Sequence, residues 1–260
     1  MVSSKNITQK EGPRVSVVIP CYNHGHFIVD TIESVRAQAY PNIEIIVVND
    51  GSSDPETIGV FKTLPEDICL IEQPNKGLAS ARNRGIETAK GEYILPLDAD
   101  DRISAEFIQR TVEVMEADRD VGIVYGLTQL FGAKSGLWPQ PAYSMPDMLF
   151  ENMIVATALY RKSDWERIGG YRPEMRYAWE DWDFWLALVA LGVRVVRLEN
   201  VTFYYRITDQ SMTRRLSFSQ KLSMFSRLIL RHKKLYLTYP GAVLRRLLSP
   251  SSRVVCDPRQ

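Results

Sequence analysis

Strand-like and helix-like stretches alternate four times between residues 15 and 117. The predicted strands are short β-branched or apolar runs at 15–19, 43–48, 68–71 and 93–97. Apolar residues recur at helical spacing in stretches between and after these runs, namely 27–39, 77–89 and 105–117. Four βα units in succession predict an α/β fold with a doubly wound, mostly parallel central sheet flanked by helices.

The second half of the chain carries a weaker pattern. Two further strands are expected at 121–125 and 154–160, and a pair of strands near 193–198 and 201–206. A helix is expected at 181–191. The Gly, Pro and Trp residues of 132–141 predict a loop.

Three carboxylates, Asp98, Asp100 and Asp101, directly follow the apolar run 93–97. In doubly wound sheets, ligands bind outside the carboxyl ends of the strands. Carboxylates at the edge of a core are costly unless they share a partner, and Mg²⁺ or Mn²⁺ takes one or two protein carboxylates together with substrate phosphates. We therefore expect Asp98 and Asp100 at a metal–diphosphate site and interpret Asp101 as the cap of the following helix.

Two other segments can contribute to such a site. Asp50 follows the second strand, and its carboxylate can either accept a hydrogen bond from a nucleobase imide or close a turn. Residues 75–85 combine a turn, which holds Lys76, with a helix that carries Arg82 and Arg84. These three cations can face phosphates or remain solvated. Small residues surround Arg82 in the sequence, so we expect this arginine to point inward.

Three acids interleave with three tryptophans in residues 179–185. Asp181 lies near a predicted helix start, where the helix dipole favours its ionised form. Aromatic faces beside a carboxylate suit a sugar acceptor next to a general base. The tryptophans can equally form the buried stripe of a capped helix, and the two roles are compatible.

Six of these segments stand in the order seen in family 2 glycosyltransferases, which the chain resembles from about residue 13 to 213. The segments are 17–23, 46–54, 75–85, 97–101, 168–171 and 180–183. Any one of them is weak evidence, but six in order are specific.

The resemblance implies a GT-A fold and inverting transfer of a sugar from a nucleotide-diphosphate sugar. Among such donors, a UDP-sugar is the first candidate. The acceptor would be a hydroxyl of a glycan, a lipid-linked or another acceptor, in cell-envelope polysaccharide or glycoconjugate biosynthesis. The implied domains are a flexible tail (1–12), a GT-A domain (13–213) with a nucleotide half (about 13–118) and an acceptor half (about 119–213), and a basic helical extension (214–260).

The resemblance also implies roles for individual residues. Asp181 would be the general base, and Mn²⁺ or Mg²⁺ would be held directly by Asp100, with Asp98 nearer the ribose. The implied nucleotide-sugar-binding residues are Pro20, Cys21, Tyr22, Asn23, Asp50, Asn75, Arg82, Asp98 and Asp100. The acceptor-side candidates are Trp179, Glu180 and Trp182.

The chain departs from the family pattern at Thr208. Members often carry a histidine in a Tyr-Arg-x-His pattern that helps to hold the metal or diphosphate, and Thr208 stands at that place here. Asp209 is a candidate replacement. With fewer protein ligands, we expect little bound metal in the absence of nucleotide.

Other function classes fit less well. A sugar-nucleotide pyrophosphorylase needs a Gly-rich, basic loop after the first strand, and residues 20–24 contain neither Arg nor Lys. A Rossmann dehydrogenase needs a G-x-G-x-x-G motif after a strand, which the chain lacks. The alternative that we retain is a catalytically degenerate sugar-nucleotide-binding or scaffold protein. Its support is Thr208, which stands where family members often carry a histidine.

Charge is distributed unevenly along the chain. Residues 214–260 hold 11 Lys/Arg and one acid, whereas the rest holds 21 Lys/Arg and 30 acids. This basic segment predicts either an anionic membrane surface as partner or a packed helix with a solvated basic face. Nucleic acid is not an expected partner, because the segment contains no recognised nucleic-acid-binding module. Three scattered cysteines and a polar N-terminus predict a cytoplasmic protein, which would be peripheral on the inner face of the membrane if the basic segment binds lipid.

Overall fold

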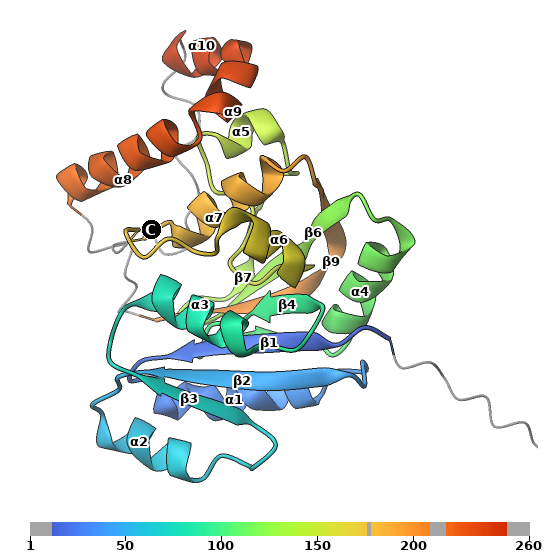
Figure 1. Ribbon diagram of the computed structural model, residues 1–260, viewed down its shortest axis with the longest axis vertical. Coiled ribbons are helices and arrows are strands. Elements are labelled where there is room, and N and C mark those ends of the chain that lie inside the picture. The colour runs from blue at the N-terminus through green and yellow to red at the C-terminus, as the bar shows by residue number, and fades with distance from the viewer. Residues whose placement is uncertain (1–11, 176–177, 209–216, 249–260) are drawn as a thin grey trace, which may run out of the picture.

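The computed structural model describes residues 12–175, 178–208 and 217–248 (Figure 1). The first half of the chain alternates strands and helices as predicted. Its elements are β1 (Val15–Cys21), α1 (Gly25–Arg36), β2 (Ile43–Asp50), α2 (Pro55–Lys62), β3 (Cys69–Gln73), α3 (Leu78–Thr88) and β4 (Tyr93–Pro96). The strands pair in the order β3-β2-β1-β4, all parallel, which confirms the doubly wound arrangement.

Helices cover both faces of these strands. Every residue of β1 is buried, as a central strand covered on both faces requires. Right-handed crossovers that traverse the sheet in opposite directions place α1 and α3 on opposite faces (Figure 1). A Cβ on Gly85 would lie 2.4 Å from Cγ1 of Val18, so a glycine is needed for α3 to approach β1 this closely.

The second half extends the same sheet with mixed strand directions. Its elements are β5 (Arg102–Ile103), α4 (Phe107–Ala117), β6 (Val121–Gly132), β7 (Gly136–Leu137), α5 (Met145–Met148), β8 (Leu159–Arg161), α6 (Lys162–Ile168), α7 (Glu180–Val189) and β9 (Arg194–Ile207). The sheet order continues β4-β8-β6-β9-β5, with β8 antiparallel to both neighbours and β6 parallel to β9.

Several predicted boundaries in this half are wrong. The pair of strands expected at 193–198 and 201–206 is the single strand β9, which stays paired with β6 across irregular registers near Leu127. The strand expected at 154–160 is reduced to β8, and the loop expected at 132–141 contains β7. Tertiary pairing therefore overrides the local turn signals in this region.

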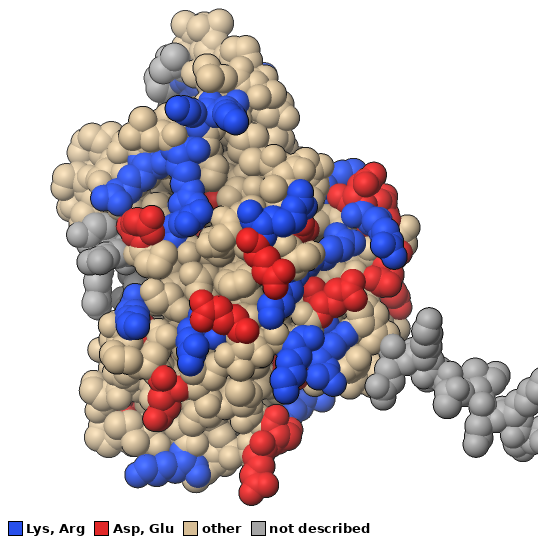
Figure 2. Space-filling view, in the orientation of Figure 1, with Lys and Arg blue, Asp and Glu red and all other residues tan. Residues whose placement is uncertain are grey.

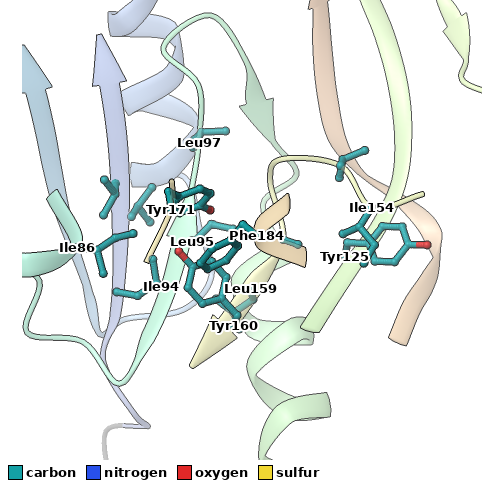
Figure 3. Close-up of a cluster of buried hydrophobic side chains, with 14 of the residues drawn as sticks. Ile86, Ile94, Leu95, Leu97, Tyr125, Ile154, Leu159, Tyr160, Tyr171 and Phe184 are labelled. Atoms are coloured by element: carbon teal, nitrogen blue, oxygen red, sulfur yellow. The ribbon is translucent and has the colours of Figure 1, made fainter. Parts of the chain in front are cut away.

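A cluster of buried side chains joins the two halves (Figure 3). The rings of Tyr171 and Phe184 stack at 3.9 Å between centroids with an interplanar angle of 10°. Tyr160 on β8 lies 5.0 Å from the Phe184 ring, and Ile94 of β4 pairs with Tyr160 across the sheet. This packing fixes α7 against the strands that end at the predicted metal site.

The C-terminal residues form α8 (Phe218–Arg231), α9 (Lys233–Thr238) and α10 (Pro240–Leu248), so the described part of the extension is helical as predicted. Ser217 begins α8 with a capping box completed by Gln220. The extension is docked on the second half of the chain, since Tyr236 donates a hydrogen bond of 2.6 Å to the carbonyl of Leu149. Among the described residues, no helix combines the length and apolar character that crossing a bilayer requires.

Candidate active site

Asp98 and Asp100 stand at the carboxyl end of β4. The strand is fully buried, and the backbone N–H of Leu97 still pairs with Val18 of β1 at 3.0 Å, so the chain leaves the sheet only at Asp98. A turn follows, closed by the N–H of Asp101 on the carbonyl of Asp98 at 3.1 Å. The side chain of Asp98 is 29% exposed, which leaves it accessible to a ligand.

The two carboxylates fit a shared divalent cation. Burial raises the pKa of Asp100, and the neighbouring Asp98 carboxylate raises it further. A cation shared by both groups would offset this repulsion. Among the described residues no group of three His, Cys, Asp or Glu side chains forms a metal site. The pair therefore fits a hard cation whose coordination is completed by a diphosphate.

Asp101 is not a helix cap, contrary to the prediction. The short strand β5 follows it, and α4 begins only at Phe107, with Glu106 at the cap position. The Asp101 side chain is buried and accepts a hydrogen bond of 2.8 Å from the backbone N–H of Arg206. Its carboxylate thus ties the turn after β4 to the end of β9.

Arg82 connects the metal-site turn to α7. Its guanidinium, 1% exposed, lies 2.7 Å from Oδ1 of Asp98 through one nitrogen and 2.7 Å from Oε1 of Glu180 through the other. Burial alone would lower the pKa of Arg82, but the carboxylates of Asp98 and Glu180 raise it well above its ordinary value. The inward orientation predicted from the small neighbours of Arg82 is confirmed.

Asp181 lies at the N-terminus of α7, next to Glu180. Its Oδ2 accepts a hydrogen bond of 3.0 Å from Nδ2 of Asn152, and its Oδ1 accepts one of 2.8 Å from the N–H of Trp182. Both carboxylate oxygens therefore accept a hydrogen bond that helps to orient the group. Glu180 is buried, which raises its pKa, and the charge of Arg82 opposes that rise.

The tryptophans around Asp181 differ in exposure. Trp182 is buried and its indole N–H donates to the carbonyl of Met148 at 2.8 Å, so it has the packing role that the sequence left open. Trp179 is half-buried in a left-handed conformation with φ of 67° and meets the Trp182 ring edge-to-face. Trp179 therefore remains available to a ligand near Asp181.

Asp50 at the end of β2 closes a turn. Its carboxylate accepts hydrogen bonds from the backbone N–H groups of Lys76 and Gly77, both at 2.9 Å, and from the amide of Gln73 at 2.7 Å. Three of the roughly four acceptor positions of a carboxylate are thus used, which leaves room for one further donor. Asn75, in the same turn, is exposed.

The residues after β1 line the same edge of the sheet. Pro20 and Cys21 are buried, and burial raises the pKa of the Cys21 thiol to about 11. Tyr22 is 48% exposed. Asn23 has a left-handed φ of 56°, and its side-chain oxygen accepts from the N–H groups at the start of α2, including that of Asp54 at 3.0 Å. This bond joins the loops after β1 and β2.

Thr208 directly follows β9, and Asp209 lies outside the described residues. Three contacts around the site were not anticipated: Asn152 on Asp181, Arg206 on the turn of Asp100, and Arg231 with His232 on Asp183. Each joins residues that are 29 or more positions apart, and the sequence pattern carries no local signal for such pairs.

Comparisons with known proteins were made on sequence and on structure. The profile of the family described as glycosyl transferase family 2 matches residues 16–181. An uncharacterized glycosyltransferase of Rickettsia typhi is 32% identical over 213 residues, covering 76% of this chain and 64% of the relative. Glycosyltransferase GlyG of Streptococcus pneumoniae is 42% identical over 113 residues, covering 42% of this chain and 38% of the relative. The chain thus spans less than two thirds of the length of either relative.

Solved structures share the fold. TarS 1-349 of S. aureus in complex with UDP-GlcNAc matches with a TM-score of 0.70 at 17% identity, covering 95% of this chain and 77% of the TarS 1-349 chain. The mannosyltransferase PcManGT from Pyrobaculum calidifontis, in complex with GDP-Man and Mn²⁺, matches with a TM-score of 0.68 at 20% identity and the same coverages. These likenesses confirm the predicted GT-A fold. Because the family profile covers more than half of its residues, the chain belongs to glycosyl transferase family 2.

Proposed function

We propose that this protein transfers a sugar, with inversion, from a nucleotide-diphosphate sugar to an acceptor hydroxyl. The observation that carries the proposal is the buried Arg82, which joins Asp98 on the donor side to Glu180, the neighbour of Asp181. Arg82 thus links the carboxylate pair Asp98 and Asp100, which suits a metal–diphosphate, to the segment that carries Asp181, which suits proton transfer. The nucleotide half would be about 13–118, the acceptor half about 119–213.

Asp181 is proposed as the general base. It would take the proton of the acceptor hydroxyl as the oxygen attacks the anomeric carbon opposite the leaving diphosphate. An aspartate has an ordinary pKa of ~3.9 and is a weak base for a hydroxyl. The proton therefore moves late, when the acceptor oxygen has begun to bond to the anomeric carbon and its O–H group has become more acidic. The donors on its two oxygens hold it in one orientation.

Asp98, Asp100 and Arg82 are proposed to serve the donor. A divalent cation, Mn²⁺ or Mg²⁺, held by Asp100 and Asp98 would supply positive charge to the leaving diphosphate. Arg82 keeps Asp98 in place and contributes a fixed positive charge nearby. The TarS complex with UDP-GlcNAc and the PcManGT complex with GDP-Man and Mn²⁺ support this donor class.

The nucleotide base is proposed to be uracil. Uracil, like thymine, presents one imide donor, and Asp50 has room for about one further donor. The TarS complexes with UDP and UDP-GlcNAc favour uracil between the two. The exposed Tyr22 would offer its ring to the base, while Pro20, Cys21, Asn23 and Asn75 would shape the pocket. A hexosyl or N-acetylhexosaminyl donor is the class that we propose.

The acceptor is proposed to be a glycan or a lipid-linked hydroxyl in cell-envelope polysaccharide or glycoconjugate biosynthesis, at the inner face of the membrane. Seven of the eleven exposed large hydrophobic side chains described lie in α8–α10. Residues 217–248 carry seven Lys/Arg and no acid, and the face in Figure 2 shows blue and tan without red around α9 and α10. Apolar side chains among cations are typical of a surface that rests on anionic lipid.

The experiment is a donor assay on the full chain. UDP-, GDP- and dTDP-sugars are incubated with Mn²⁺, with or without EDTA, and release of the nucleoside diphosphate is measured with and without candidate acceptors. We expect release with one UDP-sugar, its loss with EDTA, and in Asp181→Asn retained nucleotide binding but loss of transfer by ~10²–10⁴-fold. Near wild-type turnover of Asp181→Asn would refute the base assignment. Donor binding without any turnover would favour the degenerate binding or scaffold protein.

A further inference from the structure

Arg206, near the end of β9, is clamped between two aromatic rings. The centre of its guanidinium lies 4.4 Å from the ring centroid of Phe27 on α1 and 4.4 Å from that of Phe131 on β6. Its side chain is only 13% exposed. An arginine held between two rings has lost most of its rotamer freedom, so its donors point in fixed directions.

Those donors reach the turn that carries the metal-site carboxylates. Nε donates to the backbone carbonyl of Asp100 at 2.8 Å, and a terminal nitrogen lies 3.2 Å from Oδ2 of Asp30 on α1. The backbone N–H of Arg206 donates to Oδ1 of Asp101 at 2.8 Å. One residue of β9 thus makes hydrogen bonds on both Asp100 and Asp101.

Helix α1 also holds this turn. The hydroxyl of Thr31 lies 2.9 Å from the carbonyl oxygen of Ala99 and 2.8 Å from that of Asp101, so its one hydrogen is shared between them. The peptide between Asp100 and Asp101 is held at both ends, by the Asp98 carbonyl at its N–H and by Nε of Arg206 at its carbonyl. A rotation of that peptide would carry the Asp100 side chain away from Asp98, and the two carboxylates would no longer face one cation.

We infer that Arg206 is a positioning residue of the metal–diphosphate site, which fixes the backbone of Asp100 so that Asp98 and Asp100 present their carboxylates together. This inference rests on the proposed function. Arg206 acts through Asp100 and is given no contact with substrate. The requirement is for an arginine, because a lysine keeps the charge but has no donor at the Nε position and no planar group for two rings.

Arg102 is a matched control in the same neighbourhood. Its guanidinium lies 2.5 Å from the same Asp30 and 5.1 Å from the centroid of the same Phe131. Among the described residues it donates no hydrogen bond to the turn at 98–101, and its side chain is 43% exposed. Arg102→Gln therefore removes a cation from this cluster without removing the hold on Asp100.

The experiment measures binding of UDP to the full chain by calorimetry, with and without Mn²⁺, for wild type, Arg206→Lys, Arg206→Met, Arg102→Gln and Asp100→Asn. Thermal unfolding of each variant without ligand reports on folding. We expect both Arg206 variants to lose ~10–100-fold in Mn²⁺-dependent UDP affinity, the range for residues that orient metal ligands. UDP binding without Mn²⁺ should change less, and Arg102→Gln should behave as wild type.

The outcomes separate the inference from the proposed function. Wild-type Mn²⁺-dependent affinity in Arg206→Lys, together with its loss in Asp100→Asn, would overturn the positioning role and leave the proposed site intact. Full metal dependence in Asp100→Asn, or none in wild type, would refute the metal site and the inference with it. If Arg206→Met fails to fold, Arg206→Lys alone decides, because it keeps the charge that balances Asp30.

Discussion

The amide nitrogen of Asn152 lies 3.0 Å from Oδ2 of Asp181, the proposed base. Asn152 follows α5 in the second half of the chain, whereas the N–H of Trp182, which donates to Oδ1, belongs to α7 itself. The orientation of the carboxylate toward an acceptor hydroxyl therefore depends on a loop residue that neither a motif nor a local pattern singles out.

Replacing Asn152 by Ala should lower kcat with little change in the KM for the donor. A hydrogen bond to a charged group contributes ~1.5–3 kcal/mol, so we expect a decrease of roughly tenfold or more in kcat. Asn42→Ala is the control, since its amide binds the carbonyl of Gly12 at the opposite end of the sheet. Steady-state kinetics with varied donor tests this, and an unchanged kcat would show that the hydrogen bond from Asn152 does not orient Asp181 for catalysis.

Replacing Arg82 by Met should strongly destabilise the fold. Asp98 and Glu180 would be left without their shared cation, and removing one partner of a buried pair costs ~3–5 kcal/mol; the partial exposure of Asp98 places the effect toward the lower value. Denaturant unfolding measures the change in free energy.

Arg84→Met on the same helix is the matched control for Arg82. Its side chain is 54% exposed and lies 3.7 Å from Glu87, an ion pair that water screens, so we expect a change within ~0.5 kcal/mol. Equal effects of the two substitutions would mean that the buried bridge adds nothing to stability.

Cys21 should resist alkylation in the folded protein. Burial raises the pKa of its thiol to about 11, so the group stays protonated, and therefore weakly nucleophilic, at every pH well below that value. Cys69 is exposed. With iodoacetamide at pH 8, peptide mapping should show modification of Cys69 but not of Cys21, and modification of Cys21 should appear as the pH approaches 11 or on unfolding. Rapid labelling of Cys21 at pH 8 would contradict a buried thiol beside the proposed nucleotide pocket.

The parts that the sequence predicted correctly depend on local periodicity. The spacing of apolar residues predicts β1, β2 and α3. The carboxyl ends of parallel strands then lie at one edge of the sheet, even where the strand bounds are inexact. Asp98 and Asp50, which follow the fourth and the second predicted strand, are expected at one edge for this reason. The inward orientation of Arg82 followed from its small neighbours.

The parts that were wrong depend on partners far along the chain. Asp101 is of a residue type that often caps helices. Its carboxylate instead accepts a hydrogen bond from the backbone N–H of Arg206, 105 residues away. The two strands expected at 193–198 and 201–206 are the single strand β9, because β6 pairs with residues on both sides of Glu199 and Asn200. Neither outcome could be read from neighbouring residues, because the competing local choices have similar free energies and tertiary contacts decide between them.

The last prediction concerns the basic extension. Leu230, Leu237 and Leu244 are exposed on α8, α9 and α10. A variant with all three replaced by Ser should lose co-sedimentation with phosphatidylglycerol–phosphatidylcholine vesicles, because apolar burial and cation attraction of ~1 kcal/mol per well-placed Lys/Arg act together. Pure phosphatidylcholine vesicles should bind wild type poorly, and added salt should weaken binding to the anionic ones.

Point substitutions are preferable to truncation in this test. Removing α8 would take away Arg231, whose guanidinium lies 3.1 Å from Asp183, and would expose Trp182, which packs near Phe225. Loss of binding could then reflect damage to α7. Val29→Ser with Ile58→Ser, two exposed apolar residues of α1 and α2, provides a control at the far end of the molecule. If the triple variant sediments as wild type does, the apolar side chains of α8–α10 are not what contacts lipid, and the extension serves to brace α7 behind Asp181.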